Sequence, residues 1–353
     1  MERRALRELV GVGLGLALSL GAAEWGLPRI YSPPPLAREA DDAVTELRAS
    51  DPDTIILGSS HARAFEGVRR ALAEETRGEH RVLIVPLELG RLSAYRWLLE
   101  HRIAPLVDER RADGALARPS LRRFILVTHW WDSCFADDEP APNVPARAWT
   151  FGDFARDVAA HGLTAFNRGY SSHQWQLATA RSSVLRVRGE SSLIADDLVD
   201  SIGGLVRPHP RDPAIDRARL ERQSESWRAM IERGATDPRC HARGEIEARE
   251  AIMEFARQRG LEFTTVLFPL MPITVTRRAR ETTLRDFSQR MASLARERGH
   301  RLVDWTTSTP LLDEDFQRDF DHPAPSGVAK LARFALAGDL AFLRTPAPSR
   351  GTR

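Results

Sequence analysis

The chain has little cysteine and almost no lysine. Its 353 residues include two cysteines, Cys134 and Cys240, and one lysine, Lys330. Neither cysteine lies in a CxxC spacing, which argues against a thiolate zinc site. In an oxidising compartment the two could form a disulfide, and two cysteines so far apart are as often unpaired. Both alternatives remain open.

The chain also lacks an excess of charge of either sign. Lys and Arg number 51 against 49 Asp and Glu, and the formal net charge is +2. Proteins that bind nucleic acid usually cluster basic residues on one face, so we expect no nucleic-acid partner. A composition of 42% hydrophobic and 28% charged residues is enough to bury one large core. We therefore predict one main domain, with room for an insertion.

No uncharged run is long enough for an ordinary transmembrane helix. The longest, residues 9–23, follows three arginines and precedes Trp25. As a helix it would span about 22 Å, less than the hydrocarbon core of about 30 Å. It is either a signal anchor completed by its flanks, which we favour, or a signal peptide cleaved near Gly21 and Ala23. Both place the following chain outside the cytoplasm, periplasmic or extracellular. The protein would be held at the inner membrane by this helix, or secreted after cleavage.

Short apolar runs alternate with helical patterns along the rest of the chain. Such alternation predicts a mostly parallel five-stranded sheet covered on both faces, a three-layer α/β/α sandwich. The expected strands are 54–60, 81–87, 123–129, 261–270 and 300–305. The expected organisation is a signal segment with the start of a linker at 1–31, a linker at 32–52, the α/β domain at 53–345 with a helical insertion at about 135–245, and a disordered tail at 346–353.

The first expected strand ends in Gly58-Ser59-Ser60, directly before a helical stretch. A strand that delivers a serine to a helix can present a nucleophile, and it can also be an ordinary turn. Because sites in parallel sheets form beyond the carboxyl ends of the strands, Ser60, Gly90 and residues 129–132 are expected at one edge.

A second candidate motif, Asp319-x-x-His322, precedes the last expected helix, which Pro325 begins. The carboxylate could hold the imidazole Nδ1 while Nε2 accepts a proton from a serine. A helix-capping Asp beside a surface His is the alternative. Asp321 is the rival orienting acid and Ser59 the rival nucleophile. We prefer Asp319 because chain neighbours rarely face one another.

Together these blocks resemble the SGNH, or GDSL-type, hydrolase superfamily. Its nucleophile lies in a Gly-Asp-Ser block after the first strand, and its last block is Asp-x-x-His. The resemblance implies a flavodoxin-like fold and a catalytic triad of Ser60, His322 and Asp319. It also implies an oxyanion hole formed by the N–H groups of Ser60 and Gly90. It implies no cofactor and no metal.

Two departures from the family pattern stand out. Ser59 replaces the aspartate of Gly-Asp-Ser, and "THWWD" replaces a block that supplies an asparagine donor. Losing one oxyanion donor can raise a barrier by about 2.7–4 kcal/mol. His129, Trp130, Trp131 and Asp132 are candidate substrate contacts, although the two tryptophans could equally pack in the core. His129, Asp132 and His322 could alternatively hold a metal, a reading without a strong ligand motif.

The N-terminal segment and these departures are similar to exported SGNH-like proteins that accompany membrane-bound acyltransferases in the O-acetylation of cell-surface polysaccharides. The resemblance implies an esterase or acyltransferase that acts on an acylated carbohydrate or another ester, with a membrane-bound acyltransferase as a candidate partner. The alternative is a catalytically inactive subunit that binds polysaccharide or that membrane partner.

Overall fold

A computed structural model describes residues 15, 18, 19, 22, 35–87, 92–133, 217–237, 240, 243–317 and 320–345. The chain divides into two compact units, Met1–Arg38 with Pro145–Pro213, and Glu39–Val144 with Ala214–Arg353. The second unit contains all the described strands. Among the described helices none is long and apolar enough to span a membrane. Most of the expected signal segment and all of the expected tail at 346–353 lie outside the described residues.

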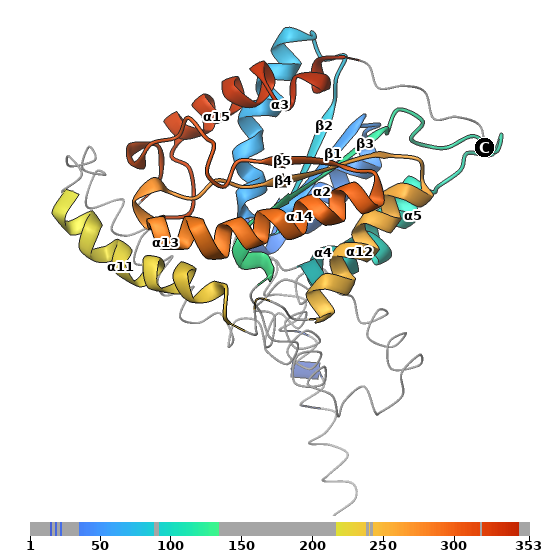
Figure 1. Cartoon of the computed structure of the whole chain (residues 1–353). Coiled ribbons are helices and arrows are strands. Elements are labelled where there is room, and N and C mark those ends of the chain that lie inside the picture. Colours follow the sequence, from blue (N-terminus) through green and yellow to red (C-terminus); the bar gives the residue numbers. More distant parts are fainter. Residues whose placement is uncertain are drawn as a thin grey trace, which may run out of the picture. The chain divides into compact units, whose positions relative to one another are not determined.

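The second unit contains one sheet of five parallel strands (Figure 1). The strands are β1 (Thr54–Ser59), β2 (Val82–Leu87), β3 (Arg123–Thr128), β4 (Glu262–Leu267) and β5 (Arg301–Asp304). Their order is β2-β1-β3-β4-β5. The chain leaves β1 toward β2 and then returns past β1 to β3, so the connections diverge between β1 and β3. Ligand sites of doubly wound sheets form at this switch point.

The strands form because their apolar residues are buried on both faces. Every residue of β1 and β3 is buried. Ile56, for example, pairs with Ile84 of β2 and with Ile125 of β3, and all three belong to one core cluster. Continuous apolar runs are typical of parallel strands that are covered on both sides. The predicted α/β sandwich is confirmed.

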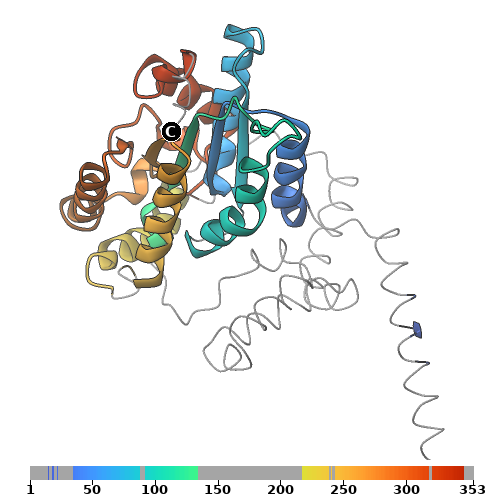
Figure 2. The ribbon, with the colours of Figure 1, turned by 90° about the vertical axis from the view of Figure 1, so that its right-hand side faces the viewer.

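Helices cover both faces of the sheet (Figure 2). Helices α3 and α15 pack on one another and share a core cluster with one face, while α4 and α12 pack on one another and α14 contacts β5. The α-helices are α2 (Pro35–Ala49), α3 (Glu66–Glu75), α4 (Leu92–Leu98), α5 (Ala104–Val107), α11 (Arg217–Gly234), α12 (Arg243–Gln258), α13 (Arg277–Ala279), α14 (Arg285–Arg298) and α15 (Pro325–Ala337). Shorter 3-10 or π segments are Ser60–Phe65, Leu99–Ile103, Trp130–Ser133, Pro272–Thr274, Arg280–Leu284, Asp313–Asp315 and Ala341–Arg344.

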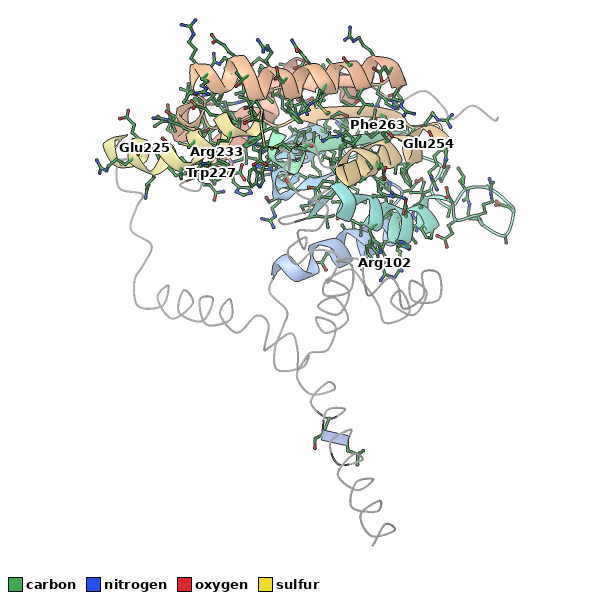
Figure 3. All side chains as sticks on the ribbon, turned by 60° about the horizontal axis from the view of Figure 1, so that its bottom comes forward. Arg102, Glu225, Trp227, Arg233, Glu254 and Phe263 are labelled. Carbon is green, nitrogen blue, oxygen red and sulfur yellow. The ribbon has the colours of Figure 1, made fainter. Side chains whose placement is uncertain are left out.

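Two predicted boundaries differ from the structure. Residues 35–49 of the expected linker form α2, because Ala43, Val44 and Leu47 recur at helical spacing and are buried. Within the expected insertion at 135–245, helix α11 belongs to the sheet unit. Trp227 of α11 packs against the core, whereas Glu225 and Arg233 are exposed (Figure 3). Residues 135–216, 238, 239, 241 and 242 of that insertion lie outside the described part of the chain.

Candidate functional site

The first half of the site is the turn after β1. Strand β1 ends at Ser59, and Ser60 begins the 3-10 helix that leads into α3. Gly58 allows β1 to lie close to β3, because a Cβ at this position would be 2.7 Å from the carbonyl oxygen of Val127. A residue with a side chain would therefore push the serine turn away from the neighbouring strand.

The second half is the loop between β5 and α15. Phe316 and Pro323 form an antiparallel bridge, and the N–H of Gln317 donates to the carbonyl oxygen of His322 over 2.7 Å. Phe320 is buried with a φ of 67°, a left-handed conformation that is rare for a bulky residue. This backbone turns the chain so that Asp321 and His322 face the serine turn.

The structure brings Ser60 and His322 together. The Oγ of Ser60 lies 2.5 Å from the Nε2 of His322. Both residues line a pocket of about 390 Å³. The remaining lining residues are Arg63, Ala64, Gln317, Pro323, Pro325 and Val328. The hydroxyl and the imidazole are therefore in hydrogen-bond contact at a cavity of ligand size.

Two of the predicted site residues, Asp319 and Gly90, lie outside the described residues. The orienting acid and the second oxyanion donor that the sequence suggests therefore stay predictions. The N–H of Ser60 is at the first position of a 3-10 helix, where an N–H has no acceptor within the helix. It stays the predicted first oxyanion donor.

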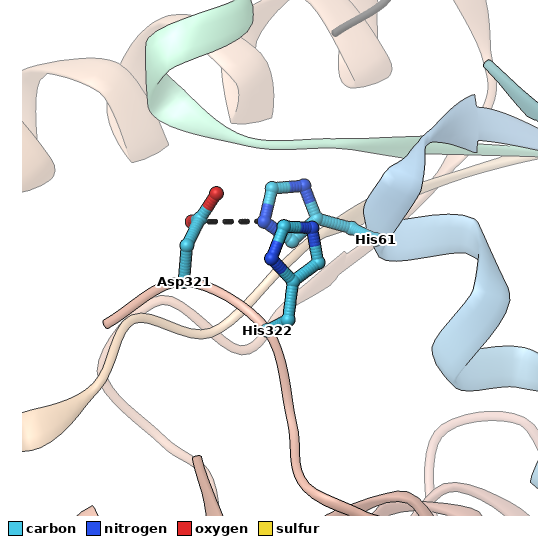
Figure 4. Close-up of side chains that lie close together, drawn as sticks. All are labelled: His61, Asp321 and His322. Atoms are coloured by element: carbon cyan, nitrogen blue, oxygen red, sulfur yellow. Dashed lines mark hydrogen bonds and ion pairs between the residues drawn. The ribbon is translucent and has the colours of Figure 1, made fainter. Parts of the chain in front are cut away.

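A second hydroxyl, imidazole and carboxylate chain lies beside the first. The Oγ of Ser59 is 2.6 Å from Nδ1 of His61. The Nε2 of His61 is 2.9 Å from Oδ1 of Asp321 (Figure 4). His61 was not among the residues selected from the sequence. Its position directly after the two serines was the available signal. Asp321, the rival acid, thus pairs with His61, a residue 260 positions away.

Three histidine rings are stacked around Asp321. His61 lies between His129 and His322, with ring centroids 4.9 Å and 5.1 Å apart and both ring pairs within 14° of parallel. Phe268, which follows β4, contacts the same ring at 4.7 Å. The carboxyl ends of β1, β3 and β4 thus meet the loop before α15 at one edge of the sheet, as the parallel topology predicts.

The charges in this cluster are set by burial and by the neighbouring groups. Burial lowers the pKa of His129 to about 3, although the Asp321 carboxylate opposes this shift. Burial alone would raise the pKa of Asp321. The charge attraction and the hydrogen bond from His61, together with the attraction of His129 and His322, outweigh this effect and lower the pKa. Asp321 is therefore a carboxylate and His129 a neutral imidazole near neutral pH.

Asp132 has a structural role within the turn after β3. Its Oδ2 accepts the backbone N–H of His129 over 2.7 Å and lies 3.3 Å from the hydroxyl of Thr128. Burial raises the pKa of Asp132 to about 6, while His61, the N–H of His129 and Arg249 act in the opposite direction.

Most of the candidate substrate contacts are in the protein interior. His129 and Asp132 are buried, and Trp130 is 2% exposed within a core cluster that includes Leu267 and Phe287. Trp131 is half-buried and packs against that cluster. None of the four lines the pocket that Ser60 and His322 share, and their contact with a substrate stays a prediction.

A metal could bind only after the histidine rings rearrange. His61, Asp321 and His322 each offer a ligand atom, and these atoms lie within 4.8 Å of one another. This set differs from the candidate metal ligands His129, Asp132 and His322 that the sequence suggests. An imidazole binds a metal through a lone pair in its ring plane. The stacked rings of His61 and His322 must tilt before both can reach one ion, so the arrangement fits hydrogen bonding better than metal binding.

Comparisons with known proteins do not identify the chain. No protein-family profile matches the sequence, and no curated protein matches it.

Proposed function

We propose that the protein is a serine esterase or O-acyltransferase that forms an acyl-enzyme on Ser60. The observation that carries the proposal is the contact of 2.5 Å between the Ser60 Oγ and the His322 Nε2 at the edge of a pocket. A nucleophile and a base within hydrogen-bond reach at a cavity are the signature of this mechanism.

In the proposed reaction Ser60 Oγ attacks the carbonyl carbon of an ester while His322 Nε2 accepts its proton. The tetrahedral oxyanion is stabilised by the N–H of Ser60 and by the predicted second donor at Gly90. When the intermediate collapses, His322 protonates the leaving alkoxide. Water or an alcohol then repeats these steps in reverse and removes the acyl group. Asp319 is the proposed orienting acid of His322.

The substrate class and the cellular location follow from the sequence resemblance. We propose O-acyl groups of a cell-surface polysaccharide as the substrate and a position outside the cytoplasm. A signal anchor would hold the protein at the inner membrane, with a membrane-bound acyltransferase as candidate partner. The pocket is compatible with such a role because four of its eight lining residues, Ala64, Pro323, Pro325 and Val328, can accommodate an apolar acyl group.

The test is covalent labelling of the full chain with a fluorophosphonate, followed by intact-mass analysis and by the hydrolysis rate of p-nitrophenyl acetate. Wild type should gain one adduct, and Ser60→Ala and His322→Ala should lose both labelling and turnover. The matched controls are Ser308→Ala and His101→Ala, which change exposed residues outside the pocket.

Labelling that persists in Ser60→Ala would refute the proposal. Folded wild-type protein with neither adduct nor turnover would refute catalysis and favour the inactive binding subunit. Added carbohydrate alcohols that take the acyl group in competition with water would identify a transferase, and their failure to do so an esterase.

A further inference from the structure

We propose that His61 is a positioning residue, which holds the Asp321 carboxylate beside the ring of His322 and so favours the imidazolium that His322 becomes when Ser60 loses its proton. The inference rests on the proposed function. It assigns His61 and Asp321 a part in the reaction in addition to the triad of Ser60, His322 and Asp319.

The hydrogen bonds of His61 fix its tautomer. A carboxylate only accepts, so the Nε2 of His61 carries the proton that is shared with Asp321 over 2.9 Å. Nδ1 is then the acceptor for the hydroxyl of Ser59 at 2.6 Å. With both ring nitrogens engaged and only 5% of the side chain exposed, His61 is suited to hold its partner in place. It is not suited to exchange protons with a substrate.

Asp321 is held where its charge acts on His322. Its Oδ1 is also 3.8 Å from the Nε2 of His129, which is neutral because it is buried. The ligand atoms of His61, Asp321 and His322 lie within 4.8 Å of one another, and the three side chains meet in Figure 4. A negative charge so close stabilises the positive charge that develops on His322 when it takes the proton of Ser60.

Few other titratable groups in the described part of the chain act on this cluster. Asp132 carries a second carboxyl group that interacts with His61 and Asp321, and Arg249 partly balances it. The proton of Ser60 passes only to His322 and from there to the leaving group. His61 and Asp321 act by position and charge, without gaining or losing a proton during turnover.

Two substitutions separate the two hydrogen bonds of His61. In His61→Gln the amide N–H can occupy the position of Nε2 and still donate to Asp321, whereas the bond to Ser59 is lost. In His61→Asn the shorter amide can still meet Ser59 but does not reach Asp321. Asp321→Asn keeps the size of the side chain and removes its charge.

We expect His61→Asn to lower kcat roughly 10- to 100-fold with little change in KM, and His61→Gln to retain most of the activity. The acid limb of the kcat/KM profile should move to lower pH in Asp321→Asn, because a negative charge beside the catalytic base is removed. His61→Asn should shift it in the same direction. A merely structural role would not move this limb.

Equal activities of His61→Asn and His61→Gln would overturn the inference, and so would an effect of His61→Asn on KM without an effect on kcat. An acid limb that does not shift in Asp321→Asn would overturn it as well. If His61→Asn does not fold, the test depends on two measurements. These are the position of the acid limb in the kcat/KM profile of Asp321→Asn and the activity of His61→Gln. Ser60→Ala separates the two proposals. Turnover that persists in Ser60→Ala refutes the proposed function, whereas loss in Ser60→Ala with normal kinetics in His61→Asn refutes only the role of His61.

Discussion

Replacing Asp132 with asparagine removes a buried charge while it preserves the local hydrogen bonds. The side chain is 4% exposed, and its Oδ2 accepts the N–H of His129 and lies 3.3 Å from the hydroxyl of Thr128. An amide oxygen can take both of these positions. The substitution therefore isolates the free-energy cost of ionising a carboxyl group in the interior.

The size of the effect follows from the shift in pKa. Burial raises the pKa of Asp132 from 3.8 to about 6, so between these values the folded protein binds more protons at this site than the unfolded chain does. The contribution of Asp132 to stability is therefore present below pH 3.8 and is lost as the pH rises through 6. At 1.36 kcal/mol for each pKa unit the full effect is about 3 kcal/mol. Asp132→Asn should gain about 2.4 kcal/mol of this relative to wild type between pH 4 and pH 7, because the unfolded carboxyl group is already more than half ionised at pH 4.

Urea unfolding of both proteins, followed by tryptophan fluorescence from pH 4 to pH 8, measures this difference in the free energy of unfolding. The pKa values of His129 and Asp321 also differ between the folded and unfolded protein. Both residues are present in wild type and in the variant, so their contributions to the difference in stability largely cancel. A difference that is independent of pH would refute the reasoning. So would a wild type that gains stability relative to the variant as the pH rises, because its carboxylate would then be stabilised by its surroundings.

Three further changes have expected outcomes. Gly327→Ala should lower the free energy of unfolding by about 1–3 kcal/mol in urea titrations, because its Cβ would overlap the backbone of Asp315; a midpoint equal to that of wild type would contradict the close approach. Overnight treatment with EDTA should leave hydrolysis of p-nitrophenyl acetate unchanged, and a loss that zinc restores would instead favour metal binding by His61, Asp321 and His322. Because Cys240 is disulfide-bonded and buried, a reducing agent should destabilise the protein by about 2–4 kcal/mol, and an unchanged unfolding midpoint would count against this contribution.

The fold could be predicted because its signal is local. Each strand is a short apolar run, and the parallel sheet follows from the alternation of these runs with helices. Helix α2 was missed because the proline-rich sequence before it suggested a linker, whereas burial of Leu47 decides its structure. That burial depends on the rest of the domain and cannot be read from the segment itself.

The candidate site could be predicted only in part. Ser60 directly follows a recognisable strand, and His322 precedes a recognisable helix. The topology brings the two residues together although 262 positions separate them. The bond between His61 and Asp321 had no comparable signal. Neither residue belongs to a spaced motif, and the loop conformation that turns Asp321 toward His61 includes the left-handed backbone of Phe320.

Ser60, and not its neighbour Ser59, is the proposed nucleophile. Tandem mass spectrometry of the peptide that contains both serines, after labelling with a fluorophosphonate, tests it most directly. The proposed mechanism predicts the adduct on Ser60, whose Oγ contacts His322 at the pocket. An adduct on Ser59 would contradict it and would make the Ser59, His61 and Asp321 chain the reactive one.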